Sequence, residues 1–332
     1  MKKVLVTGGA GYIGSHAIVE LVKAGYEPIL LDNYSNSERN VPAQIEKILG
    51  RSIQCLRGLF TQEEGITGVL HFAAFKAVGE SVADPLKYYH NNIGAMTALL
   101  QVMAEFGVGD FVFSSSCTVY GSPDSNPVTE SSPIKPATSP YGFTKQFGEQ
   151  IIHDMVASSK AFRAAVLRYF NPIGAHPTSL IGELPLGPPN NLVPYTTQTA
   201  IGIREQLTVF GGDYDTPDGT CIRDYIHVVD LAKAHVKALA YLNRQTASDF
   251  IMPVNIGTGH GHSVLEVVNS FQEVTGQKLN YKIGVRRAGD VEQVWAASGG
   301  NVELLGWKAE LSLSDALRDA WNWEKALRKR GQ

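Results

Sequence analysis

Cysteine is scarce in this sequence. Only Cys55, Cys117 and Cys221 occur among the 332 residues, and they lie far apart. This odd and scattered set predicts neither a disulfide framework nor a cysteine metal site, and it fits a reducing, cytoplasmic setting. His260 and His262 have no third residue at a spacing suited to metal binding, so we expect no bound metal.

Charge and long apolar runs are limited as well. Charged residues make up 18% of the chain and the net charge is −3, so we expect neither nucleic acid nor an anionic membrane as a partner. No apolar segment reaches the 18 residues that a membrane-spanning helix requires. Hydrophobic residues are nevertheless 44% of the sequence, enough for the packed core of one large or two modest domains.

Glycine, by contrast, is concentrated near the start of the chain. Residues 4–7 form a short apolar run typical of a buried parallel strand, and Gly8, Gly11 and Gly14 follow before a predicted helix over 15–24. Glycines at this spacing permit a tight turn and close approach of the backbone to a pyrophosphate. A second apolar run ends in Asp32, whose carboxylate can bind ribose hydroxyls and would repel a 2′-phosphate. The pattern therefore predicts a nucleotide site that prefers NAD to NADP.

Further apolar runs continue the same sheet. Residues 68–74 and 110–113 are predicted strands, separated by a long predicted helix over 85–106. The second of these strands runs into hydroxyl side chains, Ser114 to Ser116, and ligands of such sheets bind at the carboxyl ends of the strands. The fold class is therefore α/β, with a Rossmann-type doubly wound parallel sheet. We expect residues 1–170 to bind NAD and residues 171–332, a smaller α/β domain, to bind mainly the substrate, with the chain crossing between the two more than once.

Tyr141 and Lys145 carry the chemistry of the predicted site. Pro140 is suited to the first turn of a helix, and residues four apart then share one helix face. An ammonium near a phenol lowers the pKa of the phenol, so Tyr141 is predicted to act as a base towards a sugar hydroxyl. Taken alone, this spacing is equally consistent with an exposed pair on a helix.

Together, the glycine loop, the strand end at Ser114–Ser116 and the Tyr141–Lys145 pair resemble the extended short-chain dehydrogenase/reductase family. Within it the chain is similar to the UDP-galactose (UDP-glucose) 4-epimerases over nearly its whole length. Matching stretches include residues 72–81, 88–92, 167–172, 189–192, 207–211, 223–228 and 286–290.

The resemblance implies a tightly held NAD, a UDP-hexose substrate, a homodimer and a set of site residues. The implied catalytic residues are Ser116, Tyr141 and Lys145, with Tyr141 as the base and Lys145 also on the nicotinamide ribose. The implied cofactor residues are Gly8, Gly11, Tyr12, Ile13, Gly14, Asp32, Asn33, Phe72, Ala73, Lys76, Asn91, Ser114, Tyr141, Lys145 and Tyr169. The implied substrate residues are Ser116, Tyr141, Asn171, Asn191, Leu192, Thr208, Phe210, Arg223, Tyr225, Arg287, Asp290 and Val294.

Alternatives remain at this stage. Arg223 and Asp224 could form a surface ion pair, or Arg223 and Arg287 could clamp a diphosphate. A dehydratase is disfavoured because Cys117 and Thr118 stand where relatives with that activity have carboxylates. A UDP-uronic acid epimerase, or a non-catalytic NAD-binding regulator on the same fold, is also possible.

Two departures from the family pattern stand out. About ten residues separate the stretch ending at Arg57 from the next predicted strand, whereas a crossover between parallel strands needs a dozen or more. Either a helix is deleted here, or residues are missing between Gly58 and Leu59. We favour the second explanation. The residue that contacts adenine is therefore not assigned. At Val294, a large tyrosine in relatives would exclude an N-acetyl group, so we expect UDP-GlcNAc and UDP-GalNAc to be interconverted too.

Overall fold

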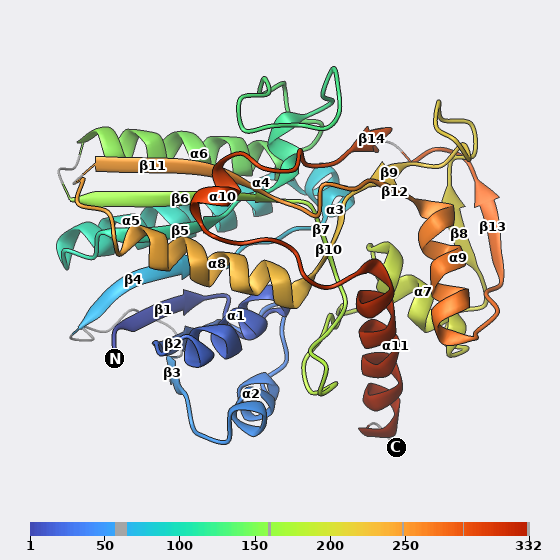
Figure 1. The fold of residues 1–332 in the computed structure, drawn as a ribbon, viewed down its shortest axis with the longest axis horizontal. Coiled ribbons are helices and arrows are strands. Elements are labelled where there is room, and N and C mark those ends of the chain that lie inside the picture. The colour runs from blue at the N-terminus through green and yellow to red at the C-terminus, as the bar shows by residue number, and fades with distance from the viewer. Residues whose placement is uncertain (57–64, 159–160, 248, 288, 331–332) are drawn as a thin grey trace.

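The computed structural model describes residues 1–56, 65–158, 161–247, 249–287 and 289–330. Its centre is a seven-stranded, fully parallel sheet in the order β11-β6-β5-β4-β1-β2-β3 (Figure 1). The strands are β1 (Lys3–Thr7), β2 (Glu27–Leu31), β3 (Gln54–Leu56), β4 (Ile66–His71), β5 (Asp110–Ser114), β6 (Phe162–Tyr169) and β11 (Asp249–Ile256). The strand order reverses between β1 and β4, which is where ligands bind in doubly wound sheets. The predicted fold class is confirmed.

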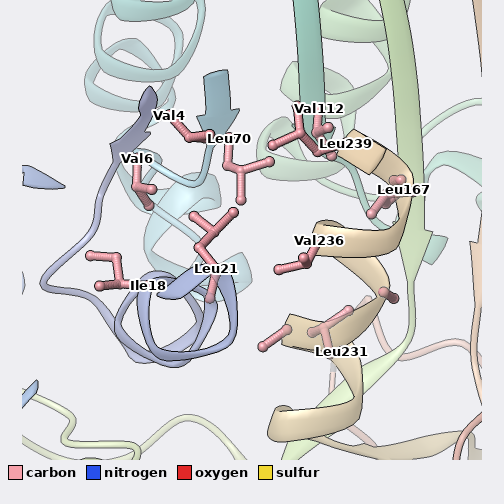
Figure 2. Close-up of a cluster of buried hydrophobic side chains, with 14 of the residues drawn as sticks. Val4, Val6, Ile18, Leu21, Leu70, Val112, Leu167, Leu231, Val236 and Leu239 are labelled. Atoms are coloured by element: carbon pink, nitrogen blue, oxygen red, sulfur yellow. The ribbon is translucent and has the colours of Figure 1, made fainter. Parts of the chain in front are cut away.

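Helices cover both faces of this sheet. On one face lie α1 (Tyr12–Lys23), α2 (Val41–Leu49) and α8 (Val228–Leu242), and on the other α5 (Ala95–Glu105) and α6 (Pro140–Ser158). Figure 2 shows Leu21 of α1 next to Leu70 of β4, and Leu239 of α8 next to Val112 of β5. Alternate strand residues point the other way: Leu5 and Val69 pack with α5 and α6. Both faces are thus buried, which explains the continuous apolar runs in the sequence.

The helix predicted over 85–106 is interrupted. It consists of α4 (Pro85–Tyr88), a π-helical segment η1 (Tyr89–Gly94) and α5. Asn92 in the π segment accepts the Phe75 N–H at 2.8 Å and donates to the Phe75 carbonyl at 3.0 Å. The wider turn therefore brings an amide side chain onto the loop after β4. Such π segments often occur at functional sites.

The remaining elements form a smaller region beside the carboxyl edge of the sheet. Its strands are β7 (Asn171–Ile173), β8 (Leu207–Phe210), β9 (Ile222–Arg223), β10 (Tyr225–His227), β12 (His262–Ser263), β13 (Tyr281–Gly284) and β14 (Gln293–Val294). Its helices include α7 (Leu192–Ala200), α9 (Val264–Thr275) and α11 (Leu313–Arg330), which surround one apolar cluster. Three short helices complete the chain: α3 (Val78–Ala83), η2 (Cys117–Tyr120) and α10 (Asn301–Leu304).

The chain enters the large sheet again from its second half. β11 pairs in parallel with β6 along its whole length, and α8 packs against α1. The segment around Gly58 and Leu59, where the sequence departs from the family pattern, lies outside the described residues. Within the described parts of the chain, no helix is both long and apolar enough to cross a membrane.

Candidate active site

The glycine loop joins β1 to α1 at the carboxyl edge of the sheet. Gly8 has a φ of +69°, a conformation that side chains other than glycine rarely adopt. A Cβ on Gly14 would lie 2.2 Å from the Gly8 carbonyl oxygen, so the helix can approach the loop this closely only without a side chain there. Gly11 precedes α1 and provides no side-chain cap. The first N–H groups of α1 therefore face outward without an intrahelical partner, a suitable seat for a pyrophosphate.

Asp32 follows β2 next to this loop. Its carboxylate accepts the Ala10 N–H at 2.9 Å and the Tyr34 N–H at 2.7 Å, which ties the glycine loop to the end of β2. The predicted neighbour Asn33 is exposed and accepts the Ser35 N–H at 2.9 Å. A fixed carboxylate at this edge can accept hydrogen bonds from ribose hydroxyls. The loop, the uncapped helix and Asp32 thus fit NAD.

Further predicted cofactor residues lie at the neighbouring strand ends. Phe72 follows β4, and the centroid of its ring lies 4.6 Å from that of His235 in α8. Ser114 is the last residue of β5, and its hydroxyl oxygen lies 3.2 Å from His235 Nε2. Tyr169 ends β6 with its ring 6.1 Å from the same histidine. Ala73 contacts the glycine loop, where a Cβ on Gly8 would lie 2.8 Å from its nitrogen. The structure therefore brings the ends of β1, β4, β5 and β6 together.

The three predicted catalytic side chains meet beside these strand ends. Ser116 precedes η2 and its Oγ accepts the Thr118 N–H at 3.2 Å, which fixes the hydroxyl oxygen. Tyr141 and Lys145 are both buried on the inner face of α6, whereas Phe143 and Phe147 of the same helix are exposed. Lys145 Nζ donates to the Ser114 carbonyl at 2.7 Å and lies 5.9 Å from the centroid of the Tyr141 ring. The predicted shared face is confirmed.

The predicted pKa direction of Tyr141 is wrong. Burial raises the pKa of Tyr141 well above its usual value, and the nearby Tyr169 adds to this, while the hydrogen bond from Ser116 lowers it only in part. Burial also lowers the pKa of Lys145, to about 8, against the opposing charge of Glu149. The reason is geometric: the ammonium donates to a backbone carbonyl, and both groups have lost water.

A buried ion pair that the sequence reasoning missed lies behind Lys145. Arg168 donates to both oxygens of Glu149, with the shortest contact 2.6 Å, and the Ser115 hydroxyl donates to the same carboxylate at 2.5 Å. Glu149 is four residues beyond Lys145 and so lies on the same helix face, a spacing that could have identified it. The pair fixes α6 to β5 and β6 at the level of the catalytic residues.

Lys76 and Asn91 occupy the loop after β4 and the π segment. Asn91 donates from Nδ2 to Asn92 Oδ1 at 2.9 Å, so the predicted cofactor residue is oriented by its neighbour. Lys76 Nζ lies 3.0 Å from Glu183 Oε1 and 5.7 Å from the ring centroid of Tyr12. Tyr12 donates its hydroxyl to the Gly174 carbonyl at 2.7 Å. Ile13 is partly buried against the core. Glu183 was not predicted, because it stands in a loop with no motif of its own.

The predicted substrate residues line the border between the large sheet and the smaller region. Asn191 directly precedes α7, Leu192 begins it, and the Asn191 amide donates to Glu183 at 2.6 Å. Asn171 starts β7, and its N–H donates to the Asp224 carbonyl at 2.9 Å. Thr208 is in β8 and lines an open hollow of about 560 Å³ with Arg204 and Lys282, all within the smaller region. Tyr225 is largely buried in the apolar cluster of the smaller region.

Arg223 and Asp224 do not form the surface ion pair that was one alternative. Asp224 is fully buried and accepts hydrogen bonds from Thr258, Gly259 and Ala296, while Arg223 donates to the Ile222 carbonyl at 2.8 Å. Asp224 lies between β9 and β10, where the N–H groups of Thr258, Gly259 and Ala296 take the place of a cationic partner.

The remaining substrate candidates lie in two places, Phe210 with Arg287 and Asp290, and Val294 near Cys117. Arg287 lies 5.8 Å from the ring centroid of Phe210 and is paired with Asp290 at 2.7 Å. Val294 is the β14 partner of Arg223 and packs with Val119, Phe170 and Cys117, adjacent to Ser116. Aromatic, cationic and apolar groups are thus available along one border of the site.

Residues 4–257 match the NAD dependent epimerase/dehydratase family. The chain belongs to this family. Its geometry agrees with the family's cofactor, because the glycine loop, Asp32 and the catalytic helix lie at one edge of the sheet. The resemblance drawn from the sequence is thereby confirmed.

Individual relatives match from end to end. The UDP-glucose 4-epimerase of Bacillus subtilis (strain 168) is 48% identical over 333 aligned residues, which cover 97% of this chain and 97% of that protein. The crystal structure of a UDP-glucose 4-epimerase from Stenotrophomonas maltophila with bound NAD and formylated UDP-arabinopyranose aligns with a TM-score of 0.96 and 45% identity, over 99% of this chain and 100% of that one. The structure of the Bifidobacterium longum enzyme in complex with NAD+ and UDP aligns with a TM-score of 0.93 and 43% identity, over 98% of both chains.

Proposed function

We propose that this protein is an NAD-dependent 4-epimerase that interconverts UDP-galactose and UDP-glucose through a transient 4-keto sugar. The observation that supports this most directly is the placement of Ser116, Tyr141 and Lys145 beside the glycine loop, in a chain that aligns end to end with 4-epimerases. Residues 1–170 would bind mainly NAD, and residues 171–332 mainly the UDP-sugar.

The chain's own residues act on the 4-hydroxyl. Tyr141 takes its proton, and Ser116, whose oxygen is fixed by the Thr118 N–H, hydrogen-bonds the same hydroxyl. The chemistry that bound NAD supplies is acceptance of a hydride from C4 and its return to the opposite face of the sugar. Lys145 would bind the nicotinamide ribose, and the positive charge of oxidised nicotinamide would lower the pKa of Tyr141 against the effect of burial.

The decisive experiment is an activity assay with UDP-galactose and no added NAD. We expect the purified protein to form UDP-glucose, which a coupled UDP-glucose dehydrogenase detects, because the reaction has no net redox change and retained cofactor suffices. If turnover occurs only after NAD is added, the proposed reaction is supported, but tight retention of NAD by the purified protein is contradicted. No turnover in either case would contradict the proposal and direct the search to UDP-uronic acids.

Val294 is the proposed determinant of activity on N-acetylated sugars. It is buried beside Cys117, and a larger side chain there would reduce the space next to the substrate. We expect the wild type to interconvert UDP-GlcNAc and UDP-GalNAc. Val294→Tyr should lower kcat/KM for UDP-GlcNAc by about 10- to 200-fold and leave UDP-galactose within about threefold. Absence of UDP-GlcNAc turnover by the wild type would refute this assignment.

We also propose a homodimer and a cytoplasmic location. Val82, Leu86, Phe143 and Phe147 are 62%, 76%, 47% and 45% exposed and lie on α3, α4 and α6, which contact one another. An exposed apolar surface of this kind favours a symmetric contact with a second copy. Phe147→Glu should yield monomers by sedimentation equilibrium, and a wild type that is already monomeric would contradict the dimer. Fractionation of the source cells tests the location.

A further inference from the structure

Glu183 connects residues on opposite sides of the site through a single oxygen. Its Oε1 accepts the Lys76 ammonium at 3.0 Å and the Asn191 amide at 2.6 Å. Lys76 belongs to the loop after β4, on the side of the glycine loop, whereas Asn191 precedes α7 in the smaller region. Glu183 is 107 residues from Lys76 in the sequence but only eight from Asn191. One carboxylate thus joins the two halves of the chain.

The backbone of Glu183 is held independently of these contacts. Trp323 of α11 donates its Nε1–H to the Glu183 carbonyl at 2.9 Å. The preceding Gly182 lies directly against the same indole, where a Cβ would approach the ring to 2.6 Å. The side chain of Glu183 is only 12% exposed, while that of Lys76 is 46% exposed. The backbone of Glu183 is therefore anchored to α11, and its mostly buried carboxylate lies between Lys76 and Asn191.

Charge strengthens the link on the Lys76 side. Burial alone would lower the pKa of Lys76, but the adjacent Glu183 carboxylate leaves it raised, so the ammonium stays charged. A hydrogen bond between charged groups is shorter and stronger than a neutral one.

On the other side, the contact with Asn191 closes the loop over residues 184–190, which contains no helix or strand. This contact therefore restrains both ends of the loop.

We infer that Glu183 is a positioning residue that makes retention of the nicotinamide cofactor and binding of the UDP moiety mutually reinforcing. This inference rests on the proposed function, in which Lys76 contacts NAD and Asn191 contacts the UDP-sugar. A ligand that orders one partner of Glu183 also orders the carboxylate and the loop for the other ligand. The second ligand then loses less conformational freedom on binding, and the coupling is reciprocal.

The release of the cofactor measures this coupling without turnover. Holoenzyme carrying NADH is mixed with excess NAD+, and the loss of NADH fluorescence is followed with and without saturating UDP, which has no hexose to touch the nicotinamide. We expect UDP to slow release from the wild type about tenfold. In Glu183→Ala, release without UDP should be faster, and UDP should slow it by less than about twofold.

Two further variants separate positioning from general stability. Glu183→Gln keeps an acceptor for Asn191 but removes the charge opposite Lys76, so its UDP effect should fall between those of the wild type and Glu183→Ala. If Glu183→Ala does not fold, Glu183→Gln takes its place in the NADH-release experiment. Glu27→Ala is the matched control, since Glu27 pairs with Arg51 at 3.0 Å at the opposite edge of the sheet and should keep the wild-type UDP effect.

The outcomes are distinct. A wild type whose release is unaffected by UDP overturns the inference, as does a Glu183→Ala variant that keeps the full UDP effect. If the wild type shows the coupling but does not convert UDP-galactose, the proposed reaction fails and the coupling stands. If it converts UDP-galactose and Glu183→Ala behaves like the wild type, only the inference about Glu183 fails.

Discussion

Replacing Tyr141 by phenylalanine is expected to lower kcat for UDP-galactose by about 10²- to 10⁴-fold. The ring of Tyr141 is 7% exposed and would remain packed on the inner face of α6, so the substitution removes the hydroxyl and little else. The hydroxyl hydrogen-bonds Ser116, which precedes η2 at the end of β5.

The pattern of the kinetic change distinguishes catalysis from structure. A group that acts only in the transition state lowers kcat and kcat/KM equally, so KM and the affinity for UDP should stay within about twofold. Tyr241→Phe is the matched control: Tyr241 lies in α8 with its ring 6.0 Å from Phe250, away from the catalytic residues, and its kcat should equal that of the wild type. A Tyr141→Phe enzyme with wild-type kcat would show that another group takes the proton.

The site could be anticipated from sequence wherever local spacing determines geometry. The glycine loop follows β1 and opens α1 because those residues are consecutive, and Tyr141 and Lys145 share a face because they are one helical turn apart. Asp32 lies beside the loop because parallel strands end at the same edge. In each case a short stretch of sequence contains the whole geometric argument.

What the sequence did not reveal depends on contacts between distant segments. The pKa of Tyr141 follows from burial, which spacing along a helix does not specify, so its predicted direction was wrong. Glu183 contacts Lys76, which is 107 residues away in the sequence. Asp224 accepts hydrogen bonds from backbone N–H groups in the loop after β11 and is not paired with Arg223. The π segment at Tyr89–Gly94 likewise coincides with a contact between Asn92 and Phe75 that no helix pattern indicates.

Acid should unfold this protein at an unusually mild pH, because four buried histidines have lowered pKa values. His16, His71, His176 and His235 are 1%, 4%, 7% and 0% exposed. Burial lowers the pKa of His16 and His71 to about 3 and that of His176 and His235 to about 4. In the unfolded chain each would titrate near 6.5. Below that pH the unfolded state therefore binds more protons than the folded state, and the free energy of unfolding falls as the pH falls.

The expected size of this effect is large. Well below pH 6.5, each such histidine lowers the free energy of unfolding by about 1.4 kcal/mol per pH unit, so the four together lower it by about 6 to 7 kcal/mol between roughly pH 6.5 and 5. Total stabilities of folded domains are about 5–15 kcal/mol. Urea unfolding at several pH values in this window measures the slope directly. A wild type whose stability is independent of pH there would contradict the burial of these rings in solution.

His71→Phe tests one of the four separately. The imidazole lies 5.9 Å from the ring of Phe111 and 6.1 Å from that of Phe113, so a phenyl ring has similar neighbours. The hydrogen bond of 2.7 Å with Thr7 would be lost, which costs about 1 kcal/mol at every pH. The slope against pH should nevertheless fall by about a quarter, because one titrating group is gone.

The exposed His153 supplies the comparison for this slope. Its side chain is 66% exposed, so His153→Gln is the matched variant that removes an imidazole from the surface rather than from the core. A loss of stability that is the same at every pH would reflect packing or the Thr7 hydrogen bond, whereas a changed slope reflects proton uptake alone. If His71→Phe kept the full wild-type slope, His71 would take up its proton as readily in the folded protein as in the unfolded chain, contrary to its position between β1 and β5.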